Sequence, residues 1–278
     1  MKKISRRSFM AAAAVSVAAL ALTACGGSAS SAASSVASSA ASSEAASSAA
    51  AAELTTVEAG KLTMATNAAF PPYEMTTDAG EFEGIDVDTA KAIAEKLGLE
   101  LQIDDMDFDA ALLSVQQGKA DIVMAGVTVT DERKAVMDFS DSYATGIQSI
   151  IVPNDSDIAS PDDLAGKKIG TQRGTTGYIY CSDDFGDENV VAYDDGLTAV
   201  QALNNGQVDA VVIDNAPAQE FVAANSGLKV LDTSYAEEDY AIGMAKGSAL
   251  EDAVNKALEE LKADGTLQAI VDKYINAN

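Results

Sequence analysis

The sequence predicts an α/β fold built from two similar lobes. Signals for strands and helices alternate along residues 54–278, which is typical of β–α units with largely parallel sheets. One pattern occurs twice: a helix end, a Gly, two further residues, an Asp and an apolar strand run through residues 115–123 and again through 203–211. The same pattern is also a common way to join a helix to a strand. Taken with the length of 278 residues, it favours two lobes with a ligand cleft between them.

Apolar periodicity places the elements in order along the chain. A strand is expected at 61–66, a helix at 88–97 with Gly98 as its stop, and a strand at 99–103. A helix over 109–117 closes at Gly118, before an apolar strand at 122–125. Ser160 and Pro161, followed by two acids, mark a helix start. Apolar stripes over 250–261 and 267–274 predict two helices near the end of the chain.

The composition excludes several kinds of chemistry. The chain has 18 Lys and Arg, 43 Asp and Glu, and no His, for a formal net charge of −25. Without His there is no Ser-His-Asp or Cys-His catalysis and no imidazole zinc site. The acidic excess argues against a nucleic-acid partner, whose phosphates require clustered Lys and Arg. We interpret the negative charge as a solubility feature, and an enzyme remains open only if it works without His.

Residues 1–25 have the pattern of an export signal. A basic start precedes an uncharged stretch over residues 9–24, which is too short for a comfortable membrane span. The stretch ends in Leu-Thr-Ala-Cys at residues 22–25 and resembles the lipobox of bacterial lipoproteins, which implies that Cys25 is acylated and becomes the first residue of the mature chain. An ordinary signal peptide with an incidental Cys is the alternative. The Arg pair also resembles a twin-arginine signal, although the general secretory route is favoured.

Residues 26–53 are almost entirely Ser, Ala and Gly. Such a segment lacks the large side chains that form a core, so we interpret it as a flexible tether. Cys181 is the one thiol besides Cys25, which leaves the mature fold without an internal disulfide. We expect Cys181 to be a buried residue without a chemical role, and a lone exposed thiol is the alternative.

Several stretches of the chain occur together in the order and spacing of one protein family. They lie at residues 65–74, 84–88, 106–108, 125–133 and 138–140. Each motif is weak by itself, but the ordered set resembles the extracytoplasmic amino-acid-binding proteins of ABC importers, the polar amino-acid family that includes glutamine-binding protein. The resemblance covers nearly all of residues 57–275. It implies a two-lobed, periplasmic-binding-protein-like fold with a hinge and a ligand cleft between the lobes.

The resemblance implies that Arg133 binds the carboxylate of the ligand. A guanidinium holds a carboxylate through two parallel hydrogen bonds, and Thr130 is expected to cap the helix that carries Arg133. Asp214, which ends the apolar strand 210–213, is expected to accept the ligand's α-ammonium group. From the residues alone, Arg133 is equally a surface residue paired with an acid, and helix capping is the alternative role of Asp214.

Further contacts are implied from both lobes. Ala125, Gly126 and Thr128 would contribute from the first lobe, through a backbone carbonyl and a hydroxyl. The loop at 172–177 resembles the family's anion-binding turn, so its amides and the hydroxyls of Thr175 and Thr176 would contact the ligand carboxylate.

The side chain of the ligand is expected to lie between Phe70 and Phe108. Asn67 stands where many relatives carry an acid, and with Gln172 opposite it predicts an uncharged polar ligand such as glutamine. Another acid, Glu74 for example, is the alternative, because it would receive a cationic side chain.

These expectations combine into one function. Lobe 1 is expected to comprise residues 55–143 and 240–278, and lobe 2 residues 144–239, with the hinge where the chain crosses between them. The protein would capture a free L-amino acid by hinge closure and deliver it to an ABC permease and its ATPase. We expect an exported monomer, lipid-anchored at the outer face of the bacterial cytoplasmic membrane, with no cofactor, metal or catalytic residue. A dehydratase-type enzyme and a ligand-sensing lipoprotein on the same fold are the alternatives.

Overall fold

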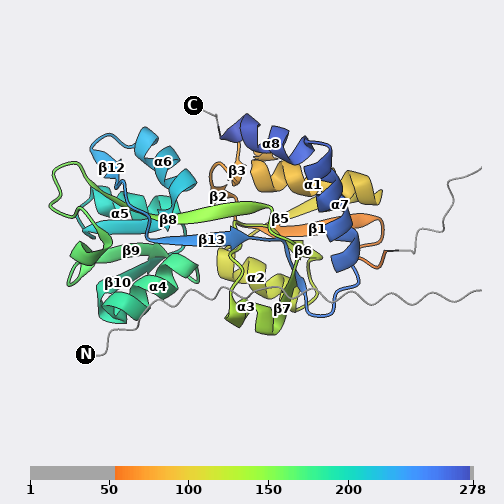
Figure 1. The fold of residues 1–278 in the computed structure, drawn as a ribbon, viewed down its shortest axis with the longest axis horizontal. Coiled ribbons are helices and arrows are strands. Elements are labelled where there is room, and N and C mark those ends of the chain that lie inside the picture. The colour runs from red at the N-terminus through yellow and green to blue at the C-terminus, as the bar shows by residue number, and fades with distance from the viewer. Residues whose placement is uncertain (1–53, 276–278) are drawn as a thin grey trace, which may run out of the picture. The chain divides into compact units, whose positions relative to one another are not determined.

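The computed structural model describes residues 54–275 (Figure 1). The predicted signal peptide (1–25), with its Cys25, and the predicted tether (26–53) lie outside the described residues. Within the described part of the chain, no helix is long and apolar enough to cross a membrane.

Residues 54–275 contain two large mixed β-sheets. The first consists of β1 (Lys61–Thr66), β5 (Glu100–Asp105), β6 (Ile122–Val123), β7 (Met137–Phe139) and β14 (Gly243–Ala245), in the order β5-β1-β6-β14-β7. The second consists of β8 (Ala144–Pro153), β9 (Ile169–Gln172), β10 (Val190–Tyr193), β11 (Ala210–Asp214) and β12 (Leu228–Val230), in the order β10-β9-β11-β8-β12, with β13 (Ala236–Tyr240) also paired to β8. A small sheet of β2 (Ala69–Phe70), β3 (Glu74–Thr76) and β4 (Phe82–Glu83) follows β1.

Helices cover both large sheets (Figure 1). With the first sheet lie α1 (Ile85–Leu97), α2 (Phe108–Gln116), α3 (Asp131–Val136), α7 (Glu251–Ala263) and α8 (Thr266–Tyr274). With the second lie α4 (Thr176–Phe185), α5 (Gly196–Asn204) and α6 (Asn215–Ala224), besides the 3₁₀ turns η1 (Pro161–Leu164) and η2 (Asp187–Asn189). The predicted stripe on α7 is buried at Val254, Leu258 and Leu261, and α7 packs on α1 and α8.

The two sheets contain the same supersecondary unit, which confirms the prediction of two similar lobes. The unit β1-α1-β5-α2-β6 in the first sheet corresponds to β9-α4-β10-α5-β11 in the second. In both, the first strand lies between the other two and runs parallel to them. The prediction of largely parallel sheets holds only for these central strands, because β7, β8, β12 and β14 are antiparallel to their neighbours.

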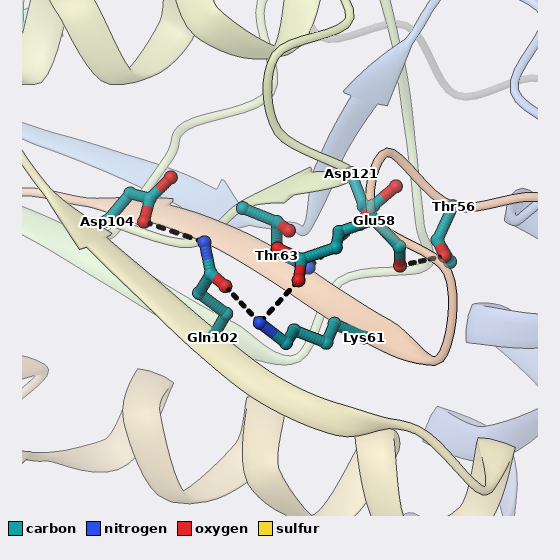
Figure 2. Close-up of polar contacts among 7 residues, drawn as sticks. All are labelled: Thr56, Glu58, Lys61, Thr63, Gln102, Asp104 and Asp121. Carbon is teal, nitrogen blue, oxygen red and sulfur yellow. Dashed lines mark hydrogen bonds and ion pairs between the residues drawn. The ribbon is translucent and has the colours of Figure 1, made fainter.

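The repeated Gly–Asp pattern has the same structural role in each unit. Gly118 and Gly206 end α2 and α5 with φ values of 65° and 68°, a backbone conformation that favours glycine. A carboxylate oxygen of Asp121 accepts the backbone N–H of Thr63 in β1 at 2.8 Å, and Asp209 accepts that of Lys168, next to β9, also at 2.8 Å. Figure 2 shows Asp121 beside Thr63 at the start of β1. Each Asp therefore fixes the amino end of the first strand of its unit, far from the ends that carry the candidate ligand residues.

Strands β8 and β13 connect the two sheets. They pair with each other over residues 144–148 and 236–240, while the second half of β8 pairs with β11 and β12. At the other end, Tyr240 forms a β-bridge with Thr128, and the Ala241 N–H donates to the Val127 carbonyl at 3.1 Å. The chain thus passes from the first sheet to the second along β8 and returns along β13 (Figure 1).

Two predicted elements differ from their observed form. The helix expected after Ser160 is only the 3₁₀ turn η1, although Ser160 and Asp163 form the capping box that its sequence suggests. The strand expected at 122–125 ends at Val123, because the chain turns at Gly126, where φ is 55°. That turn directs residues 125–128 away from the sheet.

Candidate ligand-binding site

One pocket collects the predicted site residues. It contains about 450 Å³ of empty volume, within the range of small-molecule sites. Every residue predicted for the site lines this pocket except Thr128, which lies directly behind it. The lining residues are Asn67, Phe70, Glu74, Phe108, Ala125, Gly126, Arg133, Gln148, Gln172, Thr175, Thr176, Val212, Ile213, Asp214 and Tyr240.

The topology explains why residues distant in sequence meet here. Asn67 follows β1, Phe108 follows β5 and Gly126 follows β6, so all three lie beyond the carboxyl ends of parallel strands in the first sheet. Gln172 and Asp214 are the last residues of β9 and β11 in the second sheet. Ligands of such sheets bind at this edge, and here the two edges contribute to the same pocket.

Arg133 lies in the first turn of α3, which begins at its cap Thr130. The hydroxyl of Thr130 accepts the backbone N–H of Arg133 at 3.2 Å, as predicted. The guanidinium donates to the Thr128 carbonyl at 2.8 Å and to the Gly174 carbonyl, in the second-sheet loop, at 3.2 Å. It also lies over the Phe108 ring, with 5.3 Å from the guanidinium carbon to the ring centroid. Burial lowers the pKa of Arg133 from its usual value, which still leaves this side chain charged at neutral pH.

Asp214 both caps a helix and lines the pocket. One of its carboxylate oxygens accepts the backbone N–H of Ala216 in α6 at 3.1 Å, and the other accepts that of Ile147 in β8 at 2.6 Å. Its side chain is 2% exposed, and burial raises the pKa of Asp214 to about 6. A cationic partner would stabilise this buried carboxylate, because a nearby positive charge favours the ionised form.

Three hydroxyls lie where α4 begins, close to the first-sheet loop. Thr175 is the cap of α4 and accepts the Tyr178 N–H at 3.3 Å, while its own hydroxyl donates to the Gln172 carbonyl at 2.8 Å. The Thr176 hydroxyl is 3.4 Å from that of Thr128. Thr128 does not line the pocket, because its hydroxyl donates to Glu238 of β13 at 3.1 Å.

Gly126 lies close to the aromatic side chains of Phe70 and Tyr240. A Cβ atom on Gly126 would lie 2.9 Å from Phe70 Cε1 and 3.2 Å from Tyr240 Cε2. Its N–H donates to a carboxylate oxygen of Asp86 at 3.0 Å. Both its positive φ and this crowding require glycine at this position.

Five lining residues were not predicted to be part of the site: Glu74, Gln148, Val212, Ile213 and Tyr240. Gln148 and Tyr240 lie on β8 and β13, whose pairing no local motif indicates. Val212 and Ile213 are the buried strand that leads to Asp214. Glu74 follows the first ligand loop directly, and the sequence offered it only as an alternative acid.

Cys181 is fully buried in α4, as expected, and burial raises the pKa of its thiol to about 12. Thiolate, the reactive form, is therefore scarce at neutral pH. Among residues 54–275, no group of three or more acidic or Cys side chains is arranged to hold a metal ion.

The chain resembles known proteins in sequence and in structure. A family model described as "Bacterial extracellular solute-binding proteins, family 3" matches residues 62–277. The L-cystine-binding protein TcyJ of Escherichia coli (strain K12) is 33% identical over 225 residues, which cover 80% of this chain and 85% of that protein.

Solved structures of similar proteins share the fold. The arginine-, lysine-, histidine-binding protein ArtJ of Geobacillus stearothermophilus matches with a TM-score of 0.75 and 34% identity, over 78% of this chain and 96% of that one. An ancestral arginine-binding protein, solved with glutamine and with arginine, matches with a TM-score of 0.74 and 42% identity, over 78% of this chain and 98% or 99% of that one. The matched region, the two-lobed fold and the extent of the identity agree: this chain belongs to family 3 of the bacterial extracellular solute-binding proteins.

Proposed function

We propose that the protein captures a free L-amino acid and delivers it to the permease and ATPase of an ABC importer. The observation that carries this proposal is that Arg133 and Asp214 line one pocket from different sheets. A free amino acid carries a carboxylate and an ammonium group on the same carbon. A buried guanidinium and a buried carboxylate across a small pocket match those two charges.

Each polar residue of the pocket has a role in this proposal. Arg133 binds the α-carboxylate together with the Thr175–Thr176 turn at the start of α4, where N–H groups and the helix dipole favour an anion. Asp214 binds the α-ammonium group, and the loop of Ala125, Gly126 and Thr128 supplies further contacts from the first sheet. Phe70 and Phe108 flank the ligand's side chain.

Ligand capture proceeds by hinge closure along β8 and β13. The proposed lobes are residues 55–143 with 240–278, and residues 144–239. Contacts across the pocket, such as that between Arg133 and the Gly174 carbonyl, belong to the closed form. A ligand held by Arg133 and by Asp214 touches both lobes, so its affinity is higher for the closed form, and this difference drives closure. The permease then binds that closed form, with the protein acting as a monomer.

The ligand's side chain is polar. The sequence favours glutamine, because Asn67 and Gln172 are both uncharged. These two amides hydrogen-bond to each other at 2.8 Å, which leaves them less free to recognise a ligand amide and weakens that preference. The named relatives bind cystine or arginine, lysine and histidine, and the ancestral arginine-binding protein was solved with both glutamine and arginine.

The proposed location is the outer face of the bacterial cytoplasmic membrane, through lipid on Cys25 and the tether over 26–53. Expression with labelled palmitate should place label on the wild-type protein and none on Cys25→Ser. The variant should also be released from the membrane fraction. An unlabelled wild-type protein would contradict the anchor and leave the binding function intact.

Isothermal titration against the twenty amino acids and cystine tests the binding function. Protein unfolded and refolded to remove carried ligand should bind one or a few of them. Arg133→Ala should lose this binding with an unchanged circular dichroism spectrum. Absence of binding by every compound would overturn the proposal, and turnover of prephenate or arogenate would favour the dehydratase alternative.

A further inference from the structure

A buried carboxylate lies behind Arg133 without lining the pocket. It belongs to Glu238 of β13, which is 5% exposed. Thr128 connects the two charged groups, because its carbonyl accepts a hydrogen bond from Arg133 at 2.8 Å and its hydroxyl donates to Glu238 at 3.1 Å. Burial of a charge is costly unless an opposite charge and hydrogen bonds compensate it. The surroundings of Glu238 provide both.

Hydrogen-bond donors hold the Glu238 carboxylate in place. The oxygen that accepts the Thr128 hydroxyl also accepts the side-chain amide of Gln148, in β8, at 3.0 Å. The hydroxyl of Tyr180, in α4, faces Glu238 as well, and burial together with the Glu238 charge raises the pKa of Tyr180 to about 12. Donors of this kind favour the negative form of a carboxyl group. A negative charge therefore has a fixed position between the first-sheet loop, β8 and α4.

Arg133 is the positive charge that this carboxylate balances. Burial lowers the pKa of Arg133, and the charge of Glu238 is the main influence that opposes the decrease. The hydrogen bonds of the guanidinium go to two neutral groups, the carbonyls of Thr128 and Gly174. Carbonyls satisfy N–H donors but do not neutralise a charge. In the ligand-free protein, Glu238 therefore compensates the guanidinium charge through space, and the remaining N–H groups of Arg133 stay available.

The α-carboxylate of a bound amino acid would come close to Glu238. Its proposed position is at Arg133 and the turn that begins α4. In that turn, the Thr176 hydroxyl lies 3.4 Å from the Thr128 hydroxyl that donates to Glu238. Gln148 lines the pocket and donates to Glu238 at the same time. One side chain thus separates Glu238 from this end of the pocket, so the two carboxylates would repel each other while both are attracted to Arg133.

We propose that Glu238 is an internal counter-ion of Arg133, which balances the guanidinium while the pocket is empty and weakens its attraction for the ligand's α-carboxylate. This inference rests on the proposed amino-acid binding. Glu238 touches no ligand and acts through Arg133 and Thr128, so it is a positioning residue. Its charge stabilises the ligand-free protein and lowers the affinity for the carboxylate. The same charge limits how tightly the protein holds an amino acid that it must release to the permease.

Glu238→Gln separates the charge from the hydrogen bonds. The amide oxygen of the new side chain can accept the same two bonds from Thr128 and Gln148, and its amide nitrogen can donate to the Tyr180 hydroxyl. The matched control is Glu237→Gln, which removes the charge of the exposed acid at the preceding position of β13. Circular dichroism should show that both variants fold.

L-Arginine and L-glutamine, each with its α-carboxamide, are the probes in isothermal titration at about pH 6.5, where all four carry an α-ammonium group. The ratio of the carboxamide's Kd to the amino acid's Kd should rise at least threefold in Glu238→Gln and stay at the wild-type value in Glu237→Gln. Any effect of Glu238 on Asp214 and the ammonium group cancels in this ratio. An unchanged ratio in a folded Glu238→Gln protein, even with weaker binding of both compounds, would overturn the inference, because it would indicate only a structural role.

A double-mutant cycle in urea unfolding tests the counter-ion without any ligand. In the ligand-free protein, Glu238→Gln should lower the urea midpoint, because Arg133 loses its balancing charge. In an Arg133→Met background the same change should raise the midpoint or leave it unchanged, because the carboxylate there has lost its cation. An equal decrease in both backgrounds would overturn the counter-ion. Absence of binding by every amino acid would overturn the proposed function instead, and the unfolding cycle would still decide whether Glu238 balances Arg133.

Discussion

The Nε2 atom of Gln172 donates a hydrogen bond of 2.8 Å to the Oδ1 atom of Asn67, which joins the end of β9 in the second sheet to the turn after β1 in the first. Asn67 is itself held, because its Nδ2 donates to the Met106 carbonyl at 2.9 Å. The contact therefore ties two well-fixed residues across the pocket. In the proposed hinge mechanism this contact belongs to the closed form, because the two sheets contribute to one pocket.

Removal of this link should weaken ligand binding moderately. Gln172→Ala loses one inter-lobe hydrogen bond, worth about 1 kcal/mol, so the closed form should be disfavoured and the Kd should rise about fivefold. Isothermal titration with the best ligand measures the change. The exposed Gln201→Ala on α5 is the matched control, expected to keep the wild-type Kd. Unchanged affinity in Gln172→Ala would mean that the contact does not contribute to closure.

Replacement of Arg133 by Lys should weaken ligand binding although the positive charge is kept, because the shape of the guanidinium contributes to binding. Lys keeps the charge but cannot form two parallel hydrogen bonds with a carboxylate while also donating to the Thr128 carbonyl. We expect a loss of about 3 kcal/mol, or more than a hundredfold in Kd, because a buried carboxylate would lose part of its pairing. Arg173→Lys, at an exposed residue that does not line the pocket, should stay within twofold of wild type. If Arg133→Lys bound the ligand as tightly as the wild type, binding of the carboxylate through two parallel hydrogen bonds would be contradicted.

The sequence predicted the parts of this site that follow strand ends. Asp214 could be suspected from its place at the end of a predicted strand, because the fold brings such strand ends together. Arg133 and Gly126 were named from motifs that resemble those of the amino-acid-binding family. The repeated Gly–Asp pattern predicted the two similar lobes, and the structure shows its role: the Asp binds the neighbouring strand within one unit, as Asp121 binds Thr63.

The residues that sequence reasoning missed depend on long-range pairing. Tyr240 and Gln148 enter the pocket wall because β13 pairs with β8 across a separation of about ninety residues, for which no local pattern exists. Glu238 looks like one more surface acid in an acidic chain, yet it is 5% exposed, because Thr128 and Gln148 hydrogen-bond to it. Thr128 was placed in the pocket, but its hydroxyl is turned toward this acid.

The buried acid Asp86 should make the stability of the ligand-free protein depend on pH. Its pKa is about 6 in the folded protein against 3.8 for the free side chain, so the folded form binds more protons between these values. The stabilisation by this group is fully present below pH 3.8 and is lost as pH rises through about 6. The loss is at most about 3 kcal/mol, from roughly two pKa units.

Urea unfolding of the ligand-free protein at pH 5.0 and pH 7.5 measures this effect. Asp86→Asn still accepts the Gly126 N–H and cannot ionise, so its free energy of unfolding should change less between the two pH values than that of wild type. The exposed Asp78→Asn should retain the wild-type difference. If the free energy of unfolding changed equally between the two pH values in Asp86→Asn and in wild type, Asp86 would not be the cause of the pH dependence.

A methyl group at Gly146 should disturb strand β8 of the proposed hinge and the candidate site at the same time. Gly146 lies in β8, and its Cβ would come within 2.6 Å of the fully buried Tyr240 ring and 2.8 Å of a carboxylate oxygen of Asp214. Neither neighbour can move freely, because Tyr240 packs in the core and Asp214 holds the N–H groups of Ala216 and Ile147. Gly146→Ala should therefore lower the free energy of unfolding by about 1–3 kcal/mol and weaken ligand binding. Thr145→Ala, at the exposed neighbouring position, should leave both the urea midpoint and the Kd close to wild type. If Gly146→Ala matched that control in both measurements, the close packing of β8 on Tyr240 and Asp214 would not limit the hinge.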